Sequence, residues 1–140
     1  SRHVGGVAVF DQVFVKVKEL AESYAAPYTS IANGAMPTEN GLAMYPGPGY
    51  QTEQYLDRGA EYSASIVLNG KHSNLKTLLT ALSSIHTGLT QMTEYPKTDD
   101  WQILSIETST SPNYIGREES GSRQWLYGSI LTVRFYIKGV

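Results

Sequence analysis

The sequence predicts an α+β domain in which two helices pack on one face of a mainly antiparallel, mixed sheet of about five strands, in the order α-β-β-β-α-β-β. Two stretches repeat apolar residues at the spacing of an α-helix, and others alternate apolar and polar residues as half-buried strands do. Each helical stretch has an apolar stripe on one side only, so each predicts a helix that lies against a core.

The first helix is predicted over residues 9–24, where apolar residues recur at steps of three and four. A strand is the alternative for residues 13–17, which are rich in valine and phenylalanine. Pro27 is expected to end the helix because proline lacks a backbone donor. Residues 1–8 precede the helical pattern, contain two adjacent glycines, and are expected to form a flexible N-terminal arm.

The pattern is weak between residues 28 and 58, where prolines and glycines are frequent. Two short strands fit, over residues 29–32 and 41–45, and a turn over residues 37–41 joins them. The glycines and prolines of residues 46–50 indicate a structural turn. A phosphate-binding loop is disfavoured there because no lysine and no helix follow, and because prolines remove backbone donors.

The most regular part of the sequence runs from residue 62 to residue 92. Residues 62–68 alternate as a half-buried strand, and Asn69 and Gly70 are expected to end that strand in a turn. A second helix follows over residues 75–92, with Ser73 or Asn74 as its N-cap. The residues expected to share one core are Phe14, Leu78, Leu82, Ile85 and Phe135.

Two strands, over residues 101–109 and 125–138, are predicted to form an antiparallel hairpin with a long loop over residues 110–124. The second strand is the longest. One of its faces carries Tyr136 and Ile130 among threonines and basic residues, as a subunit does where it meets a neighbour. This strand is also expected to offer an edge that a neighbour covers.

The predicted hairpin loop has the composition of a contact rim. Tyr114 and Ile115 are apolar in a polar segment, and charges of both signs follow within a few residues. The alternative is a mobile, solvated tip. The candidate interface residues are Tyr114, Ile115, Arg117, Glu118, Glu119, Arg123, Trp125 and Tyr136.

Composition narrows the class of protein. A chain of 140 residues with 41% hydrophobic and 17% charged residues is expected to form a single domain with one sizeable core. Cysteine is absent, which excludes disulfides and thiol chemistry and agrees with assembly in a reducing cytoplasm. The net charge of -2 disfavours a sequence-reading nucleic-acid binder. No signal peptide or membrane-spanning run is recognised. Ten tyrosines suit either an interface or a sheet.

No catalytic or metal-binding pattern is recognised in the sequence. His86 lies beside the apolar stripe of the second helix, where a structural histidine is expected. The acidic pairs 99–100 and 118–119 are adjacent residues, which point to opposite sides of an extended chain. Nucleophile-elbow, phosphate-loop and zinc-ligand spacings are not found. We therefore expect a protein that is not an enzyme and uses no metal and no cofactor.

Several short motifs, in this order and spacing, carry a resemblance to a known family. They are the turn Pro46-Gly47, the segment Leu68-Asn69-Gly70-Lys71, the helix end Ile85-His86-Thr87-Gly88-Leu89, and the hairpin segments Ser-Pro-Asn-Tyr-Ile-Gly-Arg-Glu-Glu (111–119) and Trp-Leu-Tyr-Gly-Ser-Ile-Leu (125–131). With the N-terminal helix and the chain length, the whole resembles the minor capsid or tail-terminator proteins of long-tailed bacteriophages of Gram-positive hosts.

The resemblance implies a virion structural protein that forms a ring, expected to be a hexamer, on the head-proximal end of the tail tube. Such a ring stops tube growth and joins the tail to the head connector, and DNA passes through its channel without sequence-specific binding. The implied partners are further copies of the chain, the tail tube protein and the head connector or stopper protein, with no membrane, and assembly in the host cytoplasm. The alternatives are a head-completion or stopper protein, and a small-molecule-binding α+β domain with a pocket near residues 45–55.

Overall fold

The computed structural model describes residues 6–37, 39–54 and 60–138, and the side chains of residues 9–37, 39–47 and 60–138. Its elements confirm the predicted α+β class and element order. In chain order they are α1 (Gly6–Ser23), β1 (Ala32–Asn33), β2 (Gly41–Gln54), β3 (Ala60–His72), α2 (Leu75–Thr90), β4 (Trp101–Arg117) and β5 (Trp125–Ile137).

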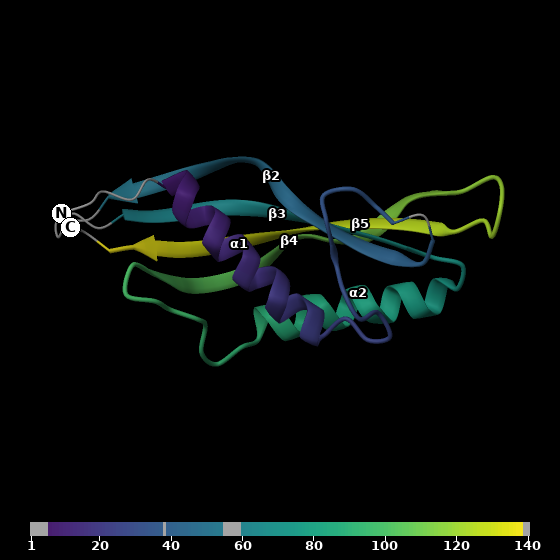
Figure 1. Ribbon diagram of the computed structural model, residues 1–140, viewed down its shortest axis with the longest axis horizontal. Coiled ribbons are helices and arrows are strands. Elements are labelled where there is room, and N and C mark those ends of the chain that lie inside the picture. The colour runs from purple at the N-terminus through teal and green to yellow at the C-terminus, as the bar shows by residue number, and fades with distance from the viewer. Residues whose placement is uncertain (1–5, 38, 55–59, 139–140) are drawn as a thin grey trace.

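The strands form one mixed sheet in the order β1-β2-β3-β5-β4 (Figure 1). β1 is parallel to β2, and every other neighbouring pair is antiparallel. The expectation that the strand over residues 125–138 offers a free edge is wrong, because β5 is hydrogen-bonded to β3 on one side and to β4 on the other. The edge strand is β4, whose sequence is more polar.

Both helices pack on the same face of the sheet. The ring of Phe10 in α1 stacks on Phe135, with centroids 5.8 Å apart, and His86 of α2 bonds to Ser129. Phe135 and Ser129 are six residues apart on β5, so their side chains lie on one face. The expected shared core is confirmed, since Phe14, Leu78, Leu82, Ile85 and Phe135 all belong to one buried cluster.

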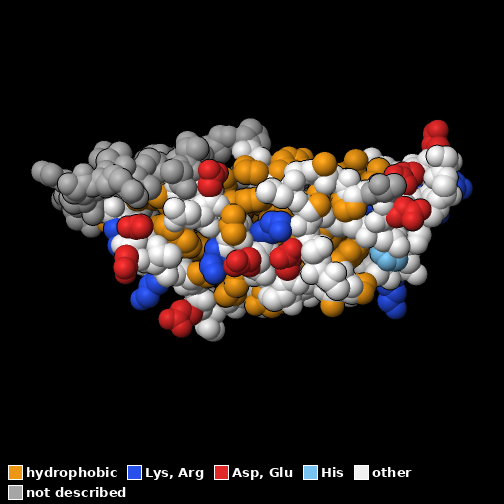
Figure 2. Space-filling model, in the orientation of Figure 1, with side chains coloured by type: hydrophobic (Ala, Val, Ile, Leu, Met, Phe, Trp, Pro, Cys, Tyr) orange, Lys and Arg blue, Asp and Glu red, His pale blue; other side chains and the backbone are white. Residues whose placement is uncertain are grey.

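The outer surfaces of the two helices differ in charge. Lys and Glu side chains gather over α1 (Figure 2), where Lys16 pairs with Glu19 and Lys18 pairs with Glu22, each at 3.3 Å. In α2 no charged residue follows Lys76, and its outward positions are mostly serine and threonine. The exposed pair of Lys16 and Glu19 contributes little to stability and keeps that surface solvated, whereas Lys18 and Glu22 are half-buried.

α2 begins at the expected cap, since the side chain of Asn74 accepts a hydrogen bond from the backbone N–H of Thr77 at 3.1 Å. α1 ends at Ser23, four residues before Pro27. Its start at Gly6 shows that the expected arm over residues 1–8 is too long by three residues. The rest of that arm lies outside the described residues.

β3 and β2 continue through the positions where turns are predicted. Gly70 lies within β3, and side chains of β2 and α2 pack closely over it: a β-carbon there would stand 2.7 Å from Leu42 Cδ2 and 2.8 Å from Leu78 Cδ1. β2 runs through residues 46–50, where a shift in its register with β3 takes the place of the predicted turn. The glycine at position 70 therefore reflects close packing, and the glycines of residues 46–50 reflect an irregular strand. The turn predicted over residues 37–41 includes residue 38, which is not described.

β4 is longer than predicted and shortens the loop that follows it. Residues 110–117, predicted as loop, pair with β5 down to Trp125, and two register shifts, between Thr110 and Asn113 and between Tyr114 and Gly116, accommodate their irregular spacing. Their polar, unperiodic sequence does not predict a strand. Cross-strand hydrogen bonds to β5 hold residues 110–117 extended. Because these residues form an edge strand, they need no buried face of their own.

His86 is the structural histidine that the sequence predicts. It is buried, and its ring nitrogens lie 2.7 Å from Ser129 Oγ and 2.7 Å from Thr108 Oγ1. Since the hydroxyl of Ser129 donates to the carbonyl of Leu68 at 3.1 Å, Ser129 accepts from Nε2–H and Nδ1 accepts from Thr108. Burial lowers the pKa of His86, which stays neutral and joins α2 to β4 and β5.

Candidate functional site

The structure brings three of the predicted interface residues together at the hairpin end of the sheet. The guanidinium carbon of Arg117 lies 4.4 Å from the ring centroid of Trp125, and the ring of Tyr114 meets Trp125 edge-on at 6.2 Å. Tyr127, which was not predicted, joins this cluster edge-on with Tyr114 at 5.8 Å. Residues two apart on a strand lie on the same face, so the position of Tyr127 beside Trp125 could have been predicted from the sequence.

Arg117 is held in place by two contacts while its side chain stays exposed. Its Nε donates to the carbonyl of Arg123 at 3.0 Å, and the ring of Trp125 lies beneath the guanidinium plane. The terminal nitrogens have no described hydrogen-bond partner. A guanidinium fixed in this way fits a carboxylate through two parallel hydrogen bonds and loses little entropy on binding.

Two of the predicted residues lie elsewhere on the sheet. Ile115 faces the side opposite to the helices, where its Cδ1 would stand 2.7 Å from a β-carbon at Gly128. Tyr136 lies at the far end of β5, in register with Glu61 and Gln102. The eight residues therefore do not form a single patch.

The tip of the hairpin is a defined turn over residues 118–124. The N–H of Glu118 donates to the carbonyl of Gln124 at 2.9 Å, and both Gly121 and Arg123 have positive φ angles, of 66° and 52°. The side chains of Glu119 and Arg123 are exposed. The alternative prediction of a solvated tip therefore applies only to residues 118–124.

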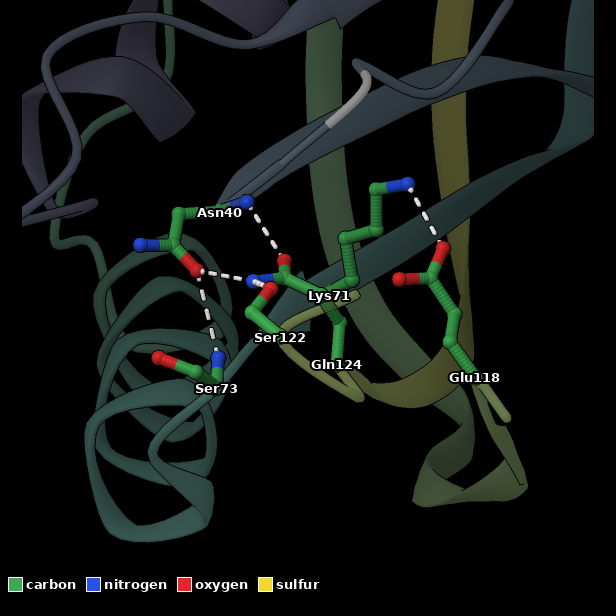
Figure 3. Close-up of polar contacts among 6 residues, drawn as sticks. All are labelled: Asn40, Lys71, Ser73, Glu118, Ser122 and Gln124. Carbon is green, nitrogen blue, oxygen red and sulfur yellow. Dashed lines mark hydrogen bonds and ion pairs between the residues drawn. The ribbon is translucent and has the colours of Figure 1, made fainter. Parts of the chain in front are cut away.

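A polar network that the sequence does not predict fixes the base of the tip. Gln124, which is 1% exposed, accepts from the N–H of Asn40 at 2.5 Å and donates to Asn40 Oδ1 at 2.7 Å and to Ser122 Oγ at 2.8 Å (Figure 3). Asn40 Oδ1 also accepts from the N–H of Ser73 at 3.2 Å. The residues joined by this network are up to 84 positions apart, so no local pattern reveals it.

An ion pair joins the tip to β3. Lys71 Nζ lies 3.2 Å from Glu118 Oε2, and the lysine side chain is 9% exposed while that of the glutamate is 35% exposed (Figure 3). A lysine buried to this extent requires a partner. Glu118 therefore supports the tip through its bond to Lys71.

The face of the sheet opposite to the helices carries an apolar row. The register places Tyr45 beside Val67, and Val67 beside Ile130. Towards the far end the face becomes polar and includes an ion pair between Arg134 and Glu61. This face is partly polar and partly apolar, as the sequence predicts for a surface that meets neighbours.

The described surface has two notable hollows. One, of about 660 Å³, lies beside α2 and Tyr24, and the other, of about 480 Å³, lies between residues 27–32 and His72. Tyr28 borders the second hollow, donates to the carbonyl of Lys71 at 2.9 Å, and has its pKa raised to about 12 by burial. The pocket predicted near residues 45–55 depends largely on side chains that are not described.

The described residues offer neither a metal-binding cluster nor a membrane-spanning helix. They include no group of three or more His, Cys, Asp or Glu side chains that could hold a metal ion. None of the described helices is both long and apolar enough to cross a membrane.

Among solved structures, the fold is similar to that of a chain in the virion of a native gene transfer agent (GTA) particle. The similarity covers 91% of this chain and 95% of that chain, with a TM-score of 0.56 and 12% sequence identity. At this identity the likeness establishes a shared fold. No protein-family model matches the chain, and no curated protein sequence matches it.

Proposed function

We propose that the chain is a structural protein of a virion and not an enzyme. The observation that carries this proposal is the fold, which the chain shares along nearly its whole length with a component of a gene transfer agent virion. The described surface agrees with a role in assembly. It presents the aromatic and arginine cluster of Tyr114, Arg117 and Trp125 at one end, and an apolar row on the sheet face opposite to the helices.

We propose more specifically that the protein acts as a tail terminator, located at the head-proximal end of a phage tail. Copies of the chain form a ring, most simply a hexamer, that caps the tail tube, stops its polymerisation and binds the head connector. The resemblance of the motifs at residues 111–119 and 125–131 to tail-terminator proteins supports this role. DNA passes through the ring without sequence-specific contacts, and the protein needs no cofactor.

The test is deletion of the gene in the phage that encodes it, followed by electron microscopy of the particles. We expect tails that are longer than normal and not joined to heads, and complementation with the wild-type gene should restore normal length. A head-completion or stopper protein would instead give tails of normal length and heads that lose their DNA. Normal, infectious particles would overturn the proposal and favour the alternative of a small-molecule-binding domain.

A further inference from the structure

The outer edge of β4 is covered over its first part only. The N–H of Thr98 donates to the carbonyl of Trp101 at 2.7 Å, and the N–H of Ile103 donates to the carbonyl of Pro96 at 3.0 Å. The hydroxyl of Tyr95 interacts with the backbone of Ile106. The connection between α2 and β4 therefore closes the edge as far as Ile106.

Beyond Ile106 the edge is open among the described residues. Every residue from 107 to 115 except Pro112 is exposed, and no described backbone hydrogen bond joins this stretch to the connection that precedes β4. The sequence has no charge from Thr108 to Gly116. Proteins commonly protect free edges with charged residues, and here only Pro112 and the register shifts interrupt a segment rich in threonine and serine.

Among the described residues, the edge on the opposite side of the sheet is also covered only in part. β1 pairs only with Ala43 and Met44, whereas β2 continues to Gln54. Three successive antiparallel pairings separate β2 from β4, so the two edge strands run in opposite directions. A neighbouring copy placed side by side would therefore present its β2 antiparallel to β4, as in the pairs within the sheet.

The two open stretches are offset along the strands. The open part of β4 lies level with residues 127–132 of β5. The part of β2 beyond Met44 lies level with residues 130–137 of β5, so the two stretches overlap only in part. A sheet that closes into a ring has tilted strands and needs such a stagger between its edges. In that arrangement the helices of all copies lie on one side of the sheet.

We propose that the sheet continues from one copy of the chain to the next, with β4 residues 107–115 of one copy pairing antiparallel with the β2 edge beyond Met44 of a second copy. The contact is head-to-tail, so it uses a different edge on each partner and can close into a ring. The inference rests on the proposed ring-forming function and identifies the surfaces that the ring joins.

Hydrogen exchange measured by mass spectrometry, on the isolated protein and on the protein in assembled tails, tests this pairing. We expect amides of residues 107–115 to exchange at least tenfold more slowly in tails, while amides of α2, which already bond within the helix, serve as the control. Unchanged exchange along residues 107–115 in intact tails would overturn the edge pairing and leave the terminator function standing. Absence of the protein from tails would overturn both.

A single-cysteine variant distinguishes head-to-tail pairing from pairing of two β4 strands. The chain has no cysteine, so Thr110→Cys introduces the only thiol. On mild oxidation of assembled tails we expect no disulfide-linked dimer, because each thiol then lies next to β2 of the neighbour, which carries no thiol. A dimer formed in high yield would show that two β4 edges meet and would overturn the proposed arrangement.

Discussion

The ring of Tyr24 lies so close to Gly88 that a β-carbon added to this glycine would stand 2.5 Å from the ring atoms Cγ and Cδ1. Tyr24 directly follows α1, and Gly88 lies in the last turns of α2. The absence of a side chain at position 88 therefore lets the end of α1 approach α2. This contact explains why a glycine lies inside the helix.

Gly88→Ala should destabilise the protein by roughly 1–3 kcal/mol, the usual cost of overpacking a close contact. The same change in an unhindered helix gives about 1 kcal/mol of stabilisation. Urea unfolding of Gly88→Ala in the wild type and in a Tyr24→Ala background separates the two effects. We expect the alanine to stabilise the Tyr24→Ala protein, and stabilisation in both backgrounds would contradict the contact.

Leu82→Ala should cost about 2–5 kcal/mol, because it leaves a cavity where α2 meets the sheet. Leu82 is fully buried, whereas Thr80 on the same helix is exposed. Thr80→Ala is therefore the matched control, with an expected effect within about 0.5 kcal/mol. Equal unfolding midpoints for Leu82→Ala and the wild type would show that the stripe does not face the core.

Gln124→Ala should cost roughly 1–3 kcal/mol, because it removes a buried side chain together with its two hydrogen bonds to Asn40. The loss should also release the hairpin tip from β2, so the amide of Asn40 should exchange faster with solvent. Ser122→Ala removes only one bond to Gln124 and is the control, with a smaller effect on both measurements. Unchanged exchange at Asn40 in Gln124→Ala would mean that the tip does not depend on this network.

The helices and the core could be predicted from the sequence because the buried apolar residues recur with the period of an α-helix. Leu78, Leu82 and Ile85 show this period, and the cap at Asn74 follows from one side chain and its nearest backbone donors. The extent of β4 was not predictable. Its residues beyond Ser109 are held by pairing with β5 and not by a pattern of their own.

The candidate site was predictable only in part, for a similar reason. Tyr114, Arg117 and Trp125 lie close together because they face each other across one hairpin. Gln124 and Lys71 find their partners through the fold of the whole sheet, over separations of 84 and 47 residues. The sequence predicts a turn at Gly70, because a glycine required by close packing cannot be told apart in the sequence from a glycine in a turn.

The stability of the protein should fall on acidification, partly through His86. Burial lowers the pKa of His86 in the folded protein, so the unfolded chain binds the proton more readily. The stabilisation is complete above the unfolded pKa of about 6.5 and is lost as the pH falls towards the folded value, by at most about 1.4 kcal/mol per pH unit.

Urea unfolding at pH 7.5 and pH 5.5 measures this contribution of His86. The stability difference between the two pH values should be smaller in His86→Gln than in the wild type. His72→Gln, at the end of β3, controls for the removal of a histidine elsewhere. An equal pH dependence in the wild type and in His86→Gln would show that this histidine does not contribute.

Arg117→Glu should impair assembly much more than folding. The folded subunit loses the stacking on Trp125 and the bond to the carbonyl of Arg123, which at an exposed site together contribute on the order of 1 kcal/mol. A carboxylate on a partner would instead meet a like charge at the point where the guanidinium offers two donors.

Two measurements separate these effects of Arg117→Glu: thermal unfolding of the isolated subunit, and the yield and length of tails made with it. We expect near-normal unfolding together with overlong tails or tails without heads. Glu119→Lys changes an exposed charge two residues away by the same amount and is the matched control, expected to leave tail length normal. Arg117→Lys keeps the charge but not the planar fork, so it should restore assembly only in part. Tails of normal length joined to heads in Arg117→Glu would show that the hairpin end is a solvated surface and that the contacts of the virion lie elsewhere on the chain.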